Sequence, residues 1–145
     1  MTSDTPWPNF WAEELDCKCN GSCGITWRNY DLDFMGLIQY YRTQLNFPFN
    51  VSSGIRCNAY DDSLGGARAH TIQIDGRAYA VDIAISGMRE YDLIDFVMRT
   101  HYSGNMQKPI RGIGRKQHGP HSGRFVHLDS LPSRSDRRIV EWTYP

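Results

Sequence analysis

Residues 65–82 read GGARAHTIQIDGRAYAVD, a run in which His70 and Asp82 flank two stretches of alternating polar and apolar residues. Alternation with a period of two is typical of β-strands. Asp75-Gly76, between the two stretches, is a strong turn signal. The run therefore predicts a β-hairpin that carries two metal ligands, His70 and Asp82.

The second half of this hairpin would have two unlike faces. One face is apolar and suits a core, with Tyr79, Val81, Ile83 and Ile85. The opposite face surrounds Asp82 with small side chains, those of Ala78, Ala80 and Ala84. Small residues around a single acid leave room for a bound group.

The register of the hairpin decides whether its two polar residues can meet. A two-residue loop at Asp75-Gly76 would pair His70 with Val81 and turn Asp82 to the opposite face. A three-residue loop over residues 75–77, or a β-bulge elsewhere, would bring His70 and Asp82 to the same face. One of these arrangements is required if both residues hold one metal ion.

A third ligand is expected from residues 125–129, FVHLD, which also alternate. His127 would share a strand face with Phe125 and Asp129. Two histidines and one carboxylate with an open fourth position form a pattern of catalytic zinc sites.

These pieces occur in a recognisable order: SGIR at 53–56, Gly65-Gly66, His70, AVD at 80–82, GIG at 112–114 and FVHLD at 125–129. The order resembles that of the zinc D-Ala-D-Ala carboxypeptidases and L-alanyl-D-glutamate endopeptidases, which share the Hedgehog-type fold. The resemblance covers nearly the whole chain. It implies an α+β fold with a small, mostly antiparallel sheet, flanking helices and one zinc-bearing cleft.

The resemblance also implies a function. A Zn²⁺ ion at His70, Asp82 and His127 would activate a water molecule that hydrolyses an amide bond in a peptidoglycan stem peptide. The small size suggests a phage lytic enzyme. The alternative is a non-catalytic zinc-containing module that binds cell wall or belongs to a virion.

The chain departs from the family pattern at two places. Arg68 stands where the family usually has a serine, two residues before the first histidine. The step from His70 to Asp82 is twelve residues (82 − 70 = 12), where the family has roughly seven. The predicted hairpin extension accounts for the difference.

Three further residues are catalytic candidates by resemblance. Arg56, in SGIR, would bind a substrate carboxylate or the developing oxyanion, for which a guanidinium offers a fixed fork of donors. The position at which many relatives carry the general base, three residues before His127, holds Arg124. His121 is therefore the first candidate for the base and Asp129 the second, with His118 third. Asp129 could instead orient a ligand histidine.

Composition limits the class of protein. The chain has 145 residues, 16 basic and 16 acidic, with a formal net charge of zero. We expect one domain over residues 1–145, with an extended N-terminal arm at 1–12, and a monomer. Mixed charge argues against a nucleic-acid partner, and the lack of a long apolar run argues against a membrane partner. The start of the sequence lacks a secretory signal, so action on the cell wall would follow release, or the protein would be associated with a virion.

Periodicity predicts helices over residues 31–45 and 86–102. Strands are expected at 47–53, 109–113, 125–129 and 139–144, with long loops at 54–66 and 114–123.

The four cysteines, at positions 17, 19, 23 and 57, allow three interpretations. They could be reduced and partly buried, they could form a structural zinc site, or a disulfide could join the N-terminal loop to Cys57. Either link would hold that loop beside Arg56.

Overall fold

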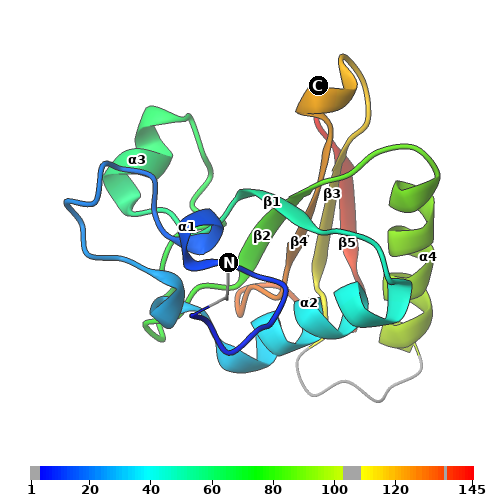
Figure 1. The fold of residues 1–145 in the computed structure, drawn as a ribbon, viewed down its shortest axis with the longest axis horizontal. Helices are drawn as coiled ribbons and strands as arrows, with labels where there is room; N and C mark the ends of the chain where they lie inside the picture. Colours follow the sequence, from blue (N-terminus) through cyan, green and yellow to red (C-terminus); the bar gives the residue numbers. More distant parts are fainter. Residues whose placement is uncertain (1–3, 103–108, 136) are drawn as a thin grey trace.

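A five-stranded sheet forms the centre of the computed structural model, which describes residues 4–102, 109–135 and 137–145. The strand order is β1 (Asn50–Ser53), β2 (Ala80–Ala84), β4 (Phe125–Asp129), β3 (Gly112–Lys116) and β5 (Val140–Thr143). Neighbours are antiparallel except β3 and β5, which run parallel (Figure 1). The mixed sheet with its helices confirms the expected α+β class.

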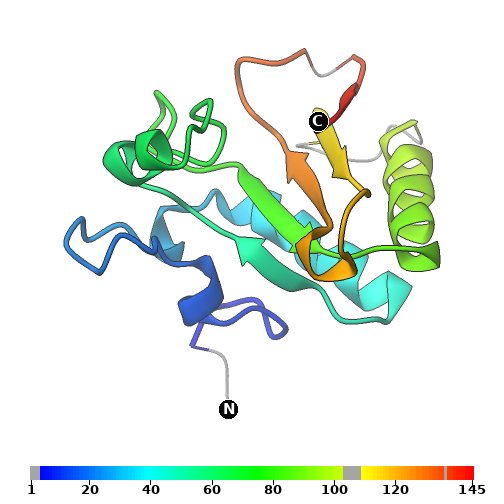
Figure 2. The ribbon, with the colours of Figure 1, turned by 90° about the horizontal axis from the view of Figure 1, so that it is seen from above.

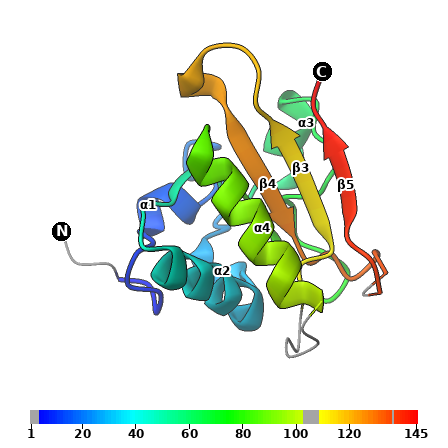
Figure 3. The same ribbon diagram turned by 90° about the vertical axis from the view of Figure 1, so that its right-hand side faces the viewer.

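Two long helices, α2 (Leu32–Leu45) and α4 (Met88–Tyr102), cover one face of the sheet (Figure 3). Both were predicted from periodicity. The Asp31 carboxylate caps α2 by accepting a hydrogen bond from the Phe34 amide at 2.9 Å. The buried core contains residues from both helices and from the facing side of the strands, including Phe34, Ile38, Leu93, Val97, Val81, Ile83, Ile113, Val126 and Leu128.

The N-terminal arm packs its aromatic residues on the domain, as expected for its described part, residues 4–12; residues 1–3 lie outside that part. Trp7 and Phe10 are buried, and the Thr5 hydroxyl donates to the Phe10 carbonyl at 2.6 Å. The arm continues into α1 (Ala12–Leu15), and a short 3-10 helix (Trp27–Asn29) brings Trp27 against Trp7 edge to face. Figure 2 shows this segment beside β1.

The predicted hairpin is wrong. Only its second half forms a strand, β2, while residues 71–79 are turns with one isolated bridge between Ala78 and Tyr30. The physical reason is that β2 is hydrogen-bonded to β1 on one side and to β4 on the other. Neither edge of β2 is free to pair with residues 71–74.

The Asp75-Gly76 turn signal itself is correct. The Gln73 amide donates to the Arg77 carbonyl at 2.9 Å, and Gly76 has a φ of 83°. The turn therefore closes on itself and presents Ile74 fully to solvent.

Two loop predictions also need correction. Residues 54–66 contain a helix, α3 (Asn58–Ser63), in place of continuous loop. The strand expected at 109–113 lies later in the chain, as β3 at Gly112–Lys116. The loop that follows is therefore shorter than expected, and it ends in a 3-10 helix (His121–Gly123). The final strand is Val140–Thr143, within the predicted range.

Glycines in β3 leave space for side chains of its neighbours. A Cβ on Gly112 would lie 2.5 Å from Asp129 Oδ2, and one on Gly114 would lie 2.7 Å from Trp142 Cε2. On the face of the sheet that α2 and α4 do not cover, Asp129 and Trp142 therefore fill the space over β3. Among the described residues, no helix is long and apolar enough to cross a membrane.

A pair of alanine substitutions tests the packing of α1 on the segment after β1. The Ile55 amide donates to the Leu15 carbonyl at 3.0 Å, and a Cβ on Gly54 would lie 2.4 Å from that same oxygen. We expect Gly54→Ala to lower the free energy of unfolding by about 1–3 kcal/mol through this clash.

Gly36→Ala is the matched control. Gly36 lies inside α2, where an added Cβ has nothing within 4 Å. This change should raise the free energy of unfolding by about 0.5–1 kcal/mol, because alanine is the better helix former. Urea denaturation of both variants measures the two changes in the free energy of unfolding. Equal changes would contradict the close approach of the Leu15 carbonyl, at the end of α1, to Gly54.

Candidate metal centre

Asp82 and His127 lie directly opposite each other on neighbouring strands. They are Cα partners in the antiparallel pairing of β2 with β4. Strand alternation turns Val81 and Ile83 into the core, so Asp82 projects from the other face, and the same holds for His127 between Val126 and Leu128. Two potential ligands therefore meet without a loop between them.

His70 reaches this face from a turn and not from a strand. The Arg56 amide donates to the His70 carbonyl at 3.0 Å, and His70 Nδ1–H donates to the Gly54 carbonyl at 2.9 Å. The SGIR segment therefore holds both the backbone and the ring of His70. A carbonyl only accepts, so Nδ1 carries the proton and Nε2 presents its lone pair.

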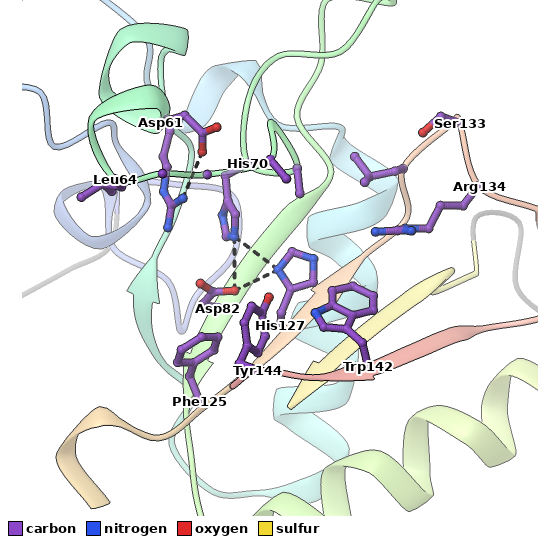
Figure 4. Close-up of a pocket in the computed structure, with 16 residues that line it drawn as sticks. Asp61, Leu64, His70, Asp82, Phe125, His127, Ser133, Arg134, Trp142 and Tyr144 are labelled. Atoms are coloured by element: carbon purple, nitrogen blue, oxygen red, sulfur yellow. Dashed lines mark hydrogen bonds and ion pairs between the residues drawn. The ribbon is translucent and has the colours of Figure 1, made fainter. Parts of the chain in front are cut away.

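Three donor atoms converge in a small triangle (Figure 4). Asp82 Oδ1 lies 2.9 Å from His127 Nδ1 and 3.2 Å from His70 Nε2, and the two nitrogens are 3.3 Å apart. Ligands bound to tetrahedral zinc at their usual distances are separated by about 3.3 Å. The spacing of the three donors therefore fits a single zinc ion.

The tautomer of His127 supports the same conclusion. His127 Nε2–H donates to Asp129 Oδ2 at 2.8 Å, which leaves the Nδ1 lone pair facing Asp82 and His70. Two lone pairs and a carboxylate oxygen thus point at one buried location. Such an arrangement is stable only with positive charge at that location, either a proton or a metal ion.

The pKa shifts of His127 and Asp82 both favour the charged forms of these two residues. Burial alone would lower the pKa of His127, but hydrogen bonds with Asp129 and Asp82 outweigh it and raise that pKa to about 9. Burial alone would raise the pKa of Asp82, but hydrogen bonds with His127 and His70 hold it well below its usual range. Asp82 is therefore a carboxylate throughout the ordinary pH range.

The triangle forms part of the wall of a cavity of about 670 Å³. Phe125, Trp142 and Tyr144 line the same cavity, as do two arginines, Arg56 and Arg134. The Tyr144 hydroxyl points toward the three donors (Figure 4). The arrangement combines a metal-ligand set, aromatic walls and cationic side chains in one enclosed space.

Arg56 lines this cavity but also has a structural role. Its NH1 donates to Asp61 at 3.0 Å, and both Nε and NH2 donate to Ser53 Oγ. Asp61 is fully buried, and its other oxygen accepts the Arg68 amide at 2.9 Å. The guanidinium of Arg56 therefore neutralises Asp61, a structural role that the sequence did not predict, and its part in binding substrate stays a prediction.

The close approach of Asp61 explains why Gly66, in the Gly65-Gly66 motif, has no side chain. A Cβ on Gly66 would lie 2.2 Å from Asp61 Oδ1. Arg68 follows with a φ of 69°. The backbone amide of Arg68 donates to Asp61, while its guanidinium, the group that departs from the family pattern, bonds to Asp62.

The geometry opposes the expected general bases. His121 lies outside the cavity, is exposed, and has Nδ1 3.1 Å from the Ser86 hydroxyl. His118 is also exposed, and its Nε2 bonds to the Tyr144 carbonyl. Asp129 is fully buried behind His127, where it accepts from that histidine and from Arg134. Asp129 therefore orients His127, the second of the two roles considered for it.

Sequence patterns did not single out Arg134, Trp142 or Tyr144. Arg134 Nε donates to Asp129 Oδ1 at 3.0 Å, and its guanidinium lies over the Trp142 ring at 5.0 Å. Trp142 in turn lies against His127, with ring centroids 5.3 Å apart. Arg134 lies in a polar connection and Trp142 in an edge strand, and neither segment has a periodic pattern that would predict these contacts. The pairing of β3 with β5 brings Trp142 to His127.

Comparison with known proteins agrees with this arrangement. No curated protein and no solved structure matches the chain. The family model described as Peptidase M15 matches residues 8–129, which include the three converging donors, Arg56 and Asp129. That match extends over most of the chain, and the chain therefore belongs to the M15 peptidase family.

Proposed function

We propose that the chain is a zinc metallopeptidase that hydrolyses an amide bond in peptidoglycan stem peptides. The observation that carries the proposal is the meeting of His70 Nε2, Asp82 Oδ1 and His127 Nδ1 at the wall of a cavity, at separations that suit tetrahedral zinc. Membership of a peptidase family supports it. The substrate partner is a stem peptide, reached in the cell wall after release or from a virion.

Zinc bound at this triangle would lower the pKa of a water ligand and polarise the scissile carbonyl. Asp129 keeps His127 in the tautomer that presents the Nδ1 lone pair, because its Oδ2 accepts a hydrogen bond from Nε2–H at 2.8 Å. Arg134 holds Asp129 in place through its Nε. This chain of contacts fixes the direction of the His127 lone pair before a ligand arrives.

Two arginines suit the carboxylate that both candidate bonds have in common. In a D-Ala-D-Ala end and in an L-Ala-D-Glu link, the leaving residue carries a free α-carboxylate. Within the described residues, neither Nη atom of Arg134 has a hydrogen-bond partner, because Nε alone contacts Asp129. Arg56 keeps unused N–H groups beyond those given to Ser53 and Asp61. We assign carboxylate binding to these two side chains.

Tyr144 is suited to stabilise the developing oxyanion. Burial raises the pKa of its phenol, with the charges of Asp82 and Asp129 adding to the shift. The phenol is therefore neutral near pH 7 and has a proton to donate. A donor in place at a partly buried cavity wall stabilises negative charge that forms there.

Loss of a ligand should abolish both metal binding and hydrolysis. We expect His127→Ala and Asp82→Ala each to lose one equivalent of zinc and to release no products from purified peptidoglycan. His121→Ala, which removes an exposed imidazole outside the cavity, should keep zinc and activity.

Metal analysis and the masses of released products check this, and the masses also identify the bond that is cut. A zinc stoichiometry that is unchanged from wild type in both ligand variants would contradict the site. A wild-type protein that binds zinc at the triangle and releases nothing would instead be the non-catalytic cell-wall or virion module.

Arg134 should determine the preference for a free carboxylate. We expect the wild-type enzyme to favour a peptide ending in D-Ala-D-Ala over its C-terminal amide by about 10- to 100-fold in kcat/KM, the size of a charge-assisted hydrogen bond. Arg134→Lys loses the guanidinium fork, so this ratio should fall toward one.

The ratio is informative because general damage to the site slows both peptides alike. An unchanged ratio of kcat/KM values in Arg134→Lys would show that Arg134 does not bind the substrate carboxylate. If neither peptide is cleaved, the same ratio can be taken on peptides that end in L-Ala-D-Glu with the α-carboxylate free or amidated.

Tyr144→Phe removes the proposed oxyanion donor and little else. We expect kcat to fall by about 100-fold with KM nearly constant, because the hydrogen bond forms only as charge develops. Tyr91→Phe, on the exposed surface of α4, is the matched control and should leave kcat unchanged. Steady-state kinetics, with zinc content measured in parallel, tests this prediction. An unaltered kcat in Tyr144→Phe would show that the phenol does not stabilise the oxyanion and only packs in the cavity wall.

A further inference from the structure

The four cysteines of the chain gather at one place, away from the cavity. Cys17, Cys19 and Cys23 follow α1, and Cys57 precedes α3 some 40 positions after Cys17 (57 − 17 = 40). All four are free, and their Sγ atoms lie within 4.8 Å of one another. Cys17 is buried and the other three are half-buried.

Backbone amides point at these sulfurs. The Cys57 amide donates to Cys17 Sγ at 3.2 Å, the Ile25 amide to Cys23 Sγ at 3.4 Å, and the Tyr60 amide to Cys57 Sγ at 3.4 Å. Hydrogen bonds of this kind favour the thiolate, which is the form that binds metals.

The loop between the first three cysteines is bent to bring the sulfurs together. Asn20, Gly21 and Gly24 all have positive φ, at 73°, 82° and 70°. Such conformations are costly for most residues and typical of tight turns. Three of them within five residues (24 − 20 + 1 = 5) turn the chain around a central point.

Of the three interpretations that the sequence allows, mutual contact of all four sulfurs favours a metal. A disulfide needs only two sulfurs and gives no reason for the other two to converge. Thiolates bound to tetrahedral zinc at the usual Zn–S distance lie about 3.8 Å apart, which is inside the observed limit. The Tyr60 amide bonds to Cys57 because Cys57 caps α3, but simple packing of thiols gives no reason for the Cys57 and Ile25 amides to point at Cys17 and Cys23.

We propose that Cys17, Cys19, Cys23 and Cys57 bind a structural zinc ion, distinct from the metal site at His70, Asp82 and His127. The proposal does not depend on peptidase activity. A closed site with four protein ligands and no open position is the form that structural zinc takes.

Such a zinc would connect the N-terminal segment to the residues that hold His70. Cys57 follows Arg56 directly, and Arg56 and Gly54 contact the backbone and ring of His70. Cys17 lies two residues after Leu15, whose carbonyl accepts the Ile55 amide. The helix α1 has only four residues, so a metal crosslink supplies the rigidity that such a short element lacks.

Zinc content and cobalt spectroscopy of the full chain test the proposal. We expect two zinc ions per wild-type chain and one in His127→Ala. After replacement by Co²⁺, both proteins should show thiolate-to-cobalt charge-transfer absorption in the near ultraviolet. Because His127→Ala keeps every cysteine, this result is independent of the fate of the catalytic site.

Cysteine variants complete the test. Cys19→Ser and Cys57→Ser should each lose one zinc and the cobalt charge-transfer band, while Ser22→Ala in the same loop keeps both. If the cysteine variants fail to fold, the zinc content and the cobalt spectra of the wild-type chain and of His127→Ala still decide. Alkylation of the unfolded wild-type chain without reductant then excludes a disulfide if all four cysteines are modified.

Four results would overturn the proposal. One is a wild-type chain whose only zinc disappears in His127→Ala. The second is a cobalt protein without the thiolate band, and the third is a chain in which two cysteines resist alkylation because they form a disulfide. Iron in place of zinc in the purified protein would likewise reject the assignment.

Discussion

The pairing of Asp82 with His127 across β2 and β4 is the constraint on which the rest of the site depends. Register places both side chains on the face that the helices leave uncovered, and it places them at hydrogen-bond distance. A shift of either strand by one residue would turn its candidate ligand into the apolar core. The apolar residues on either side of Asp82 and His127 therefore fix the positions of these two candidate ligands as well as forming the core.

That pairing continues across the sheet as a single row. His127 faces Gly114 on β3, and Gly114 faces Trp142 on β5. Because Gly114 has no side chain, the indole occupies its place and reaches the His127 ring. One glycine thus lets an edge strand contribute to a site that is two strands away.

The charges around the site are arranged in connected pairs. Arg134 compensates Asp129 behind His127, and Arg56 compensates Asp61 beside the turn that carries His70. Each arginine is partly exposed while its aspartate is fully buried. The buried charges are therefore neutralised by side chains that still border the cavity, an arrangement that joins structural support to the proposed binding of substrate.

Support for His70 comes from outside the sheet. Its ring and backbone are held by Gly54 and Arg56, and this segment packs on α1 through Leu15. The cluster of cysteines lies at the same junction. The geometry of one donor therefore depends on the N-terminal segment, far away in sequence, whereas the other two depend on neighbouring strands.

Periodic patterns in the sequence determined much of this protein. Alternation placed Asp82 and His127 on the polar faces of two strands, a three- to four-residue period predicted both long helices, and the order of short motifs indicated the family. The strand predictions succeed because side-chain direction in a strand follows from sequence parity.

Only the tertiary structure decided how His70 joins the other two donors. Residues 71–74 alternate as a strand would, yet β1 and β4 already occupy both edges of β2, so the expected hairpin cannot form. The same applies to Trp142 and Tyr144, which the parallel pairing of β3 with β5 brings to the site. Strand order is a property of the whole chain, and a local pattern contains no information about which edges other segments will use.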